Sequence, residues 1–291
     1  MTDLAPEVTD SAPRRWGPRA FSGLRRVPFG VALATLVVIF LVLCALFPEL
    51  IAPKDPYQLS LLHSLRAPSL AFPFGTDQLG RDIFSRVVHG ASYSLSIGLG
   101  ATLIAVTVGL LVGLIAGSAG GAVDLAFMRI IDVLLAFPAL FMSMAVVALI
   151  GKGSLNVLLA IAIAEIPRYA RIVRSQVLVV RQSGYVEAAL ILGQRRWVTL
   201  LRHVLPNTIG PLIVLSTLGI GSAILSSAAL SYLGLGPKPP TPEWGLMLAE
   251  GQGYLRKAWW IGVFPGIFAT LTVVSTTVLG RYLKALSDGR A

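Results

Sequence analysis

The chain carries little charge for its length. Only 13% of its 291 residues are charged, whereas 55% are apolar and the mean hydropathy is +0.77. Several apolar stretches reach the roughly 20 residues that a helix needs to cross about 30 Å of hydrocarbon. This composition excludes an ordinary soluble protein and predicts an all-α integral membrane protein.

Cysteine and histidine are scarce as well. The single cysteine, Cys44, excludes an intrachain disulfide and a cysteine metal cluster. The Gly-Lys-Gly-Ser run at 151–154 lacks the upstream glycine of a phosphate-binding loop, because Val146 occupies that position. The histidines are far apart and form no HExxH pair; they are His63, His89 and His203. We therefore expect no catalytic residue, metal or cofactor in this chain.

Apolar stretches alternate with polar segments along the chain. Residues 27–48 are charge-free and longer than the core of a cleaved signal peptide, so they are interpreted as an uncleaved signal anchor and first span. Together the stretches predict a six-helix transmembrane domain over 27–288 that follows a flexible basic tail, 1–26. The six expected spans are about 27–48, 92–117, 128–150, 154–174, 208–233 and 258–281.

The basic residues indicate an orientation. If both termini are cytoplasmic, 16 of the 24 Lys and Arg residues lie on the cytoplasmic side, which is the expected bias for a multi-pass protein of the cell membrane. This also explains the net charge of +10 without nucleic-acid binding, for which the chain offers no solvent-exposed domain.

Two loops on the predicted outer side are long, 49–91 and 234–257. The first contains turn-forming glycines and charged residues, and the second is stiffened by four prolines. Either loop could cap a pathway or dock an external partner; the alternative is ordinary packing at the membrane interface. The docking candidates are Asp77, Arg81, Asp82 and Trp244.

Ionisable residues at membrane depth are costly and indicate a role. Arg129 and Asp132 are three residues apart, as are Glu165 and Arg168, so each pair can form a salt bridge within one helix. We interpret both pairs as structural or gating elements.

Glycines recur in the second span at Gly109, Gly113 and Gly117. Four-residue spacing of small residues allows two helix backbones to approach closely. The sequence therefore predicts that this helix is central in the fold.

An arginine-rich segment, 182–207, interrupts the apolar chain. Apolar residues recur there at intervals of three to four, from Ala188 to Val204, which predicts two short helices joined by a bend near Gly193. We expect Pro206 to end the second helix. The segment is suited to act as a mechanical lever; the alternative is an interfacial helix resting on lipid head groups.

The same segment resembles a known family. Its Glu-Ala-Ala, Gly and Leu-Pro elements match in register the cytoplasmic signature of the membrane subunits of ATP-binding-cassette importers. His203, where an aliphatic residue is usual, resembles the peptide-importer branch, and segments 75–86 and 239–245 resemble the C-type permease of dipeptide, oligopeptide and nickel importers. The matching residues are Glu187, Ala188, Ala189, Gly193, Leu205 and Pro206.

The resemblance implies a type I importer permease with six transmembrane helices, in a bacterial or archaeal cell membrane. It implies that a second permease forms a heterodimer with this chain, that two cytoplasmic ATPases bind ATP and Mg, and that an extracytoplasmic binding protein delivers a peptide. Trp197 and His203 join the signature residues as the expected ATPase-coupling surface. A nickel or other small-solute importer is the alternative within the family, and a stand-alone secondary transporter is the alternative outside it.

Overall fold

The computed structural model describes residues 28–287, so the predicted basic tail, 1–26, lies outside the described residues. The described part is helical, with one isolated β-bridge between Thr76 and Asp82. The elements are α1 (Phe29–Leu46), α2 (Pro48–Ile51), η1 (Leu61–His63), α3 (Ile83–Ala119), α4 (Gly121–Leu135), α5 (Ala139–Ile150), α6 (Ser154–Arg181), α7 (Gly184–Ile191), α8 (Arg196–Thr199), η2 (Leu200–Val204), α9 (Leu205–Tyr232), α10 (Trp244–Gln252) and α11 (Trp260–Ser287).

Four helices are long and apolar enough to cross a membrane, and α4 and α5 together form a fifth candidate if the bent pair is one span. The four are α1, α3, Arg196–Tyr232 and Trp260–Leu286. The remaining predicted span corresponds to α6, which contains Glu165 and several arginines. The all-α membrane fold is confirmed, while the count of six spans stays a prediction.

The predicted span over 128–150 is not one continuous helix. Its helix breaks between Leu135 and Ala139, and the two halves are bent by 91°. Pro138 precedes α5 with an extended ψ of 134°. Proline disfavours helical geometry in the residue before it and supplies no N–H, so the break falls at this position.

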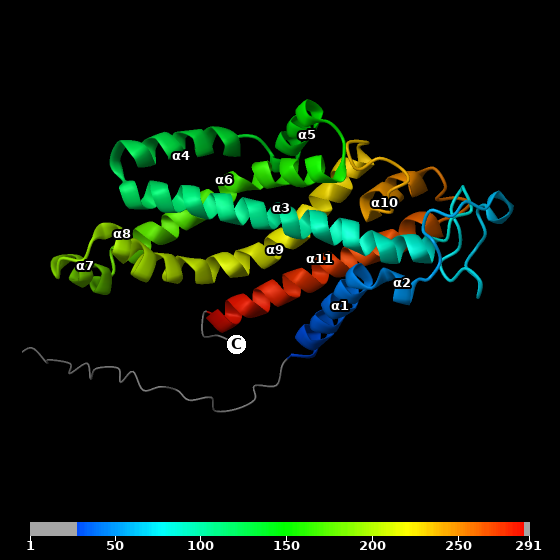
Figure 1. The fold of residues 1–291 in the computed structure, drawn as a ribbon, viewed down its shortest axis with the longest axis horizontal. Helices are drawn as coiled ribbons and strands as arrows, with labels where there is room; N and C mark the ends of the chain where they lie inside the picture. Colours follow the sequence, from blue (N-terminus) through cyan, green and yellow to red (C-terminus); the bar gives the residue numbers. More distant parts are fainter. Residues whose placement is uncertain (1–27, 288–291) are drawn as a thin grey trace, which may run out of the picture.

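The long helix α3 lies at the centre of the bundle and packs closely on α6 (Figure 1). A Cβ atom added at Gly109 would lie 2.6 Å from Cβ of Tyr169, and one at Gly113 would lie 2.6 Å from Cβ of Val173. These distances are shorter than side-chain carbons tolerate, so the predicted close approach at these glycines is confirmed.

The bundle has two unlike ends (Figure 1). Helices α7 and α8 project from one end, called here the lever end and comprising residues 182–204. Helix α10 and the segment before α3 cover the opposite end, called here the α10 end and comprising residues 52–86 and 234–258. Helix α9 runs from the lever end toward the α10 end, so one rigid element connects them.

Candidate functional site

The lever end is built around a sharp helix stop. Gly193 follows α7 with a φ of +83°, in the left-handed region that favours glycine. The N–H of Gly193 donates to the carbonyl of Leu190 and the N–H of Gln194 donates to that of Ala189, both at 3.0 Å. This pairing is a Schellman motif, which satisfies the last carbonyls of α7 and redirects the chain. The predicted short first helix and the bend at Gly193 are confirmed, whereas the second helix is not short, because it continues to Tyr232.

The surface of the lever end is open and partly apolar. Glu187 and Ala188 are exposed, Leu192 is 87% exposed, and Trp197 is 59% exposed. Several of the regularly spaced apolar residues of this segment are therefore exposed. The side chains that anchor the segment are those of Val186, Thr199 and Val204, which are buried.

The predicted helix end at Pro206 is also wrong. Helix α8 passes through the π-helical turn η2 into α9, and Arg196–Tyr232 is continuous. Leu205, immediately before the proline, donates to the carbonyl of Leu200 in the wider π-helical pattern. A wide turn here relieves the clash that proline causes in a regular helix. Helix α8, the turn η2 and helix α9 therefore form one continuous piece, to which α7 is joined through the bend at Gly193.

The rest of the signature lies along this junction. The rings of His203 and Tyr185 face each other edge to face with centroids 6.3 Å apart, which connects η2 to α7. Leu205 is half-buried and Pro206 is exposed.

A cavity of about 390 Å³ separates the lever end from the end of α3. Arg181, the last residue of α6, lines this cavity, and its Nη1 donates to the carbonyl oxygens of Gly117 at 2.6 Å and Ser118 at 3.1 Å. Cations are favourable at a helix C-terminus, where carbonyls lack helical partners. Arg181 thus joins the end of α6 to the end of α3, and the cavity leaves the lever end loosely packed beside this contact.

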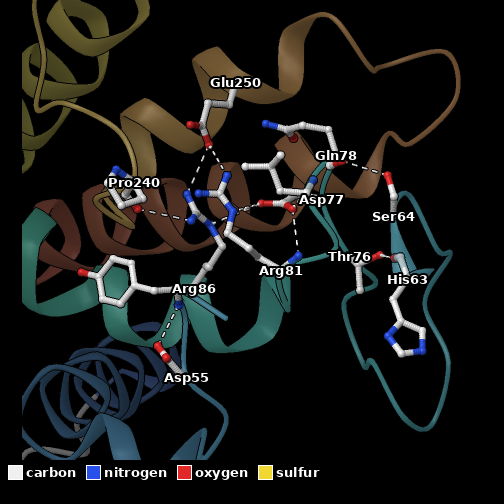
Figure 2. Close-up of polar contacts among 12 residues, drawn as sticks. Asp55, His63, Ser64, Thr76, Asp77, Gln78, Arg81, Arg86, Pro240 and Glu250 are labelled. Atoms are coloured by element: carbon white, nitrogen blue, oxygen red, sulfur yellow. Dashed lines mark hydrogen bonds and ion pairs between the residues drawn. The ribbon is translucent and has the colours of Figure 1, made fainter. Parts of the chain in front are cut away.

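The α10 end holds a buried ionic network (Figure 2). Nε of Arg81 donates to Oδ2 of Asp77 at 2.5 Å. Oε2 of Glu250, on α10, accepts from Nη2 of Arg86 at 3.2 Å and from Nη2 of Arg81 at 3.4 Å. Both arginine side chains are no more than 2% exposed. Glu250 therefore fastens α10 to the first turns of α3.

The four predicted docking candidates are all buried. Asp77, Arg81, Asp82 and Trp244 are between 1% and 6% exposed. Asp82 caps α3 by accepting from the N–H of Phe84 at 3.1 Å, and Nε1 of Trp244 donates to the carbonyl of Val87 at 2.9 Å. In this structure these side chains hold the two loops together and do not face a partner.

Glu243 was not among the site residues predicted from the sequence. Its Oε2 caps α10 by accepting from the N–H of Leu246 at 2.8 Å and also accepts from Oγ of Ser231 on α9 at 2.9 Å, while Oε1 accepts from Oγ of Ser227 at 3.4 Å. Burial raises the pKa of the Glu243 carboxyl. Its place three residues before Leu246 is a capping signal, but the serine partners are visible only in the fold.

The ionisable residues near the middle of the chain pair differently from the prediction. Nη1 of Arg168 lies 3.6 Å from Oε2 of Glu165, so that pair is confirmed. The Arg129–Asp132 pair is wrong, since Asp132 bonds to Arg171 of α6. Asp132 and Arg171 are on different helices, so no sequence spacing indicates their contact.

A second contact between α4 and α6 was also missed. Arg174 donates to both carboxylate oxygens of Asp124, at 2.5 and 2.6 Å. Such a bidentate pair fixes two helices in register.

Over residues 28–287, no cluster of three or more His, Cys, Asp or Glu side chains is arranged to hold a metal ion. The most distinctive features are the exposed pair of helices α7 and α8, the long helix α9 that connects the two ends, and the buried ionic network that holds the α10 end together.

Comparison with known proteins identifies the family. Residues 109–291 match the family described as binding-protein-dependent transport system inner membrane component. A probable D,D-dipeptide transport system permease protein of Escherichia coli is 42% identical over 268 residues, which cover 92% of this chain and 90% of that protein. A glutathione transport system permease protein of Shigella flexneri is 47% identical over 256 residues, covering 88% of this chain and 84% of the relative. The chain therefore belongs to the family of inner membrane components of binding-protein-dependent transport systems.

Proposed function

We propose that this chain is one permease subunit of an ATP-driven importer of dipeptides or other short peptides, and that its lever end couples it to a cytoplasmic ATPase. The observation that carries the proposal is the exposed α7–α8 pair, with Glu187 and Trp197 open to solvent, of which α8 is continuous with the membrane-crossing α9. A partner that moves the pair would move α9 with it.

The expected cycle follows from this connection. ATP and Mg bind to two ATPase subunits, which close and shift the groove that holds α7. Motion of α9 then opens a pathway formed by this chain and a second, different permease. An external binding protein docks on the α10 end, on a surface shaped by the buried residues Asp77, Arg81, Asp82 and Trp244. Both ligands must favour the same conformation for the cycle to be coupled.

The topology proposed with this cycle has six spans, formed by α1, α3, the α4–α5 pair, α6, α9 and α11, with the lever end and both termini in the cytoplasm. The positive-inside bias supports it. In right-side-out vesicles, a cysteine placed at Leu62, which is 89% exposed at the α10 end, should react with an impermeant thiol reagent. One placed at Leu192 should react only after the membrane is made permeable.

The peptide substrate is supported by the relatives, whose names specify D,D-dipeptide and glutathione transport. The test is ATP-dependent uptake of labelled dipeptide and glutathione by the reconstituted complex, with nickel as a competing substrate. Uptake of nickel but of neither peptide would favour the alternative importer.

Co-purification tests the partners. A complex extracted in mild detergent through a tag on this chain should contain an ATPase and a second permease. A tagged chain that carries out uptake alone, without ATP, would contradict the proposal and indicate a secondary transporter.

A further inference from the structure

A row of charged side chains lies on the exposed faces of α4 and α6. Arg168 and Arg171 are 49% and 51% exposed, and Asp132, opposite Arg171, is 57% exposed. Glu165 completes the row beside Arg168 and is 15% exposed. These four residues are called here the charged row.

The contacts with α3 place the charged row at membrane depth. Residues 168 and 171 of α6 flank Tyr169 and Ala170, which pack on Gly109 of α3. Gly109 lies ten residues, or about 15 Å, before the end of α3. Between Arg86 and that end, α3 has no acidic residue, lysine or arginine. The charged row is therefore beside the apolar part of a membrane-crossing helix.

Contact of a half-exposed arginine with lipid at that depth is energetically unfavourable. Charged side chains within a membrane helix are disfavoured against lipid and usually face water or other protein groups. The ion pairs leave about half of each of three side chains open, so this face must meet water or protein in the assembled transporter.

We propose that the charged row lines the water-filled pathway and contacts the charged ends of a zwitterionic peptide, the arginines binding its carboxylate and Glu165 its ammonium. This rests on the proposed function and adds the substrate-contacting residues. The row has both signs of charge, as a zwitterion requires, and arginine matches a carboxylate with two parallel hydrogen bonds.

The hydrogen bonds within the charged row are incomplete. Oε2 of Glu165 is buried and has no hydrogen-bond partner, although Arg168 lies 3.6 Å away. Solvent-exposed ion pairs contribute little to stability, so a passing substrate can replace one at little cost. The Asp124–Arg174 pair differs, since both oxygens of Asp124 are engaged and Asp124 is 17% exposed. That pair joins α4 to α6 and is not among the residues proposed to contact the substrate.

Accessibility in the intact complex tests the location. Cysteine is introduced at Arg168 or Arg171 and, as the matched control, at Leu111, which lies on α3 between Gly109 and Gly113 and is 55% exposed. A charged, membrane-impermeant thiosulfonate should label residues 168 and 171, as read on this chain by mass spectrometry, and leave residue 111 unlabelled. Equal protection of all three positions would overturn the proposal.

Selectivity tests the contact. Uptake of a dipeptide with a free carboxylate is compared with uptake of the same dipeptide amidated at its C-terminus. Arg168→Gln or Arg171→Gln should raise KM for the free peptide about tenfold, the equivalent of one lost charge-assisted contact, and should leave KM for the amide unchanged. Arg168→Lys should partly restore the preference.

An unchanged preference in both glutamine variants would also overturn the proposal. Failure of the proposed function is distinct, because then the wild-type complex itself would show no ATP-dependent peptide uptake.

Discussion

The two ends of this molecule treat charge and exposure in opposite ways. At the α10 end, Arg81 and Arg86 are buried and share Glu250, so the network is complete within one chain. At the lever end, Glu187 and Trp197 are open to solvent. The buried and fully paired charges of the α10 end indicate a rigid region. The exposed side chains of the lever end indicate a surface that another protein covers.

The largest effect is expected at the helix stop of the lever end. Gly193→Leu should abolish transport or uncouple it from ATP hydrolysis, because a side chain strains the left-handed conformation at φ +83°. No atom would obstruct a Cβ at Gly193 or at Gly184, and Gly184 has no such φ. Gly184→Leu is thus the matched control and should retain transport. Glu187→Lys should uncouple as well, and normal uptake in both Gly193→Leu and Glu187→Lys would remove the coupling role.

Breaking the network at the α10 end should destabilise the protein. Glu250→Gln leaves Arg81 and Arg86 buried with less compensating charge, which typically costs about 3–5 kcal/mol. The melting temperature of the purified complex should fall clearly. The control is Glu49→Gln, at an exposed position in α2, which should leave it unchanged; an equal response of the two variants would show that burial does not matter here.

The carboxyl of Glu243 should make stability depend on pH. Because its pKa is raised in the folded state, the folded protein holds this proton more tightly than the unfolded protein does. The free energy of unfolding therefore falls as pH rises from the unfolded pKa through the folded one. Melting temperatures of wild type relative to Glu243→Gln should decline over that range, and a difference that rises with pH would contradict the assigned cause.

The smallest effect on stability is expected at the exposed ion pair between Asp132 and Arg171. Asp132→Asn removes the partner of Arg171 where both side chains are about half exposed, so the stability change should stay below about 1 kcal/mol. A loss of stability as large as that caused by Glu250→Gln would mean that this ion pair contributes as much to the folded state as the buried network of the α10 end.

Features that depend on a single residue type could be predicted from the sequence better than contacts between distant segments of the chain. The bend at Gly193 and the close packing at Gly109 and Gly113 depend on glycine itself, which permits a left-handed turn or a close backbone approach wherever it lies. The break at Pro138 was missed because proline inside a helix sometimes kinks it and sometimes ends it. The opposite error occurred at Pro206, where a π-helical turn accommodates the ring.

The sequence by itself determined the membrane-embedded helical fold, the family signature at Glu187 to Pro206 and the existence of a bend, because hydrophobicity, glycine conformation and motif spacing are local properties. Only the tertiary structure decided which charges meet: Glu250 with Arg81 and Arg86, Asp132 with Arg171, and Glu243 with the serines of α9. Those partners are separated by 12 to 169 residues, and an electrostatic contact depends on distance in space, which chain spacing within one helix does not report.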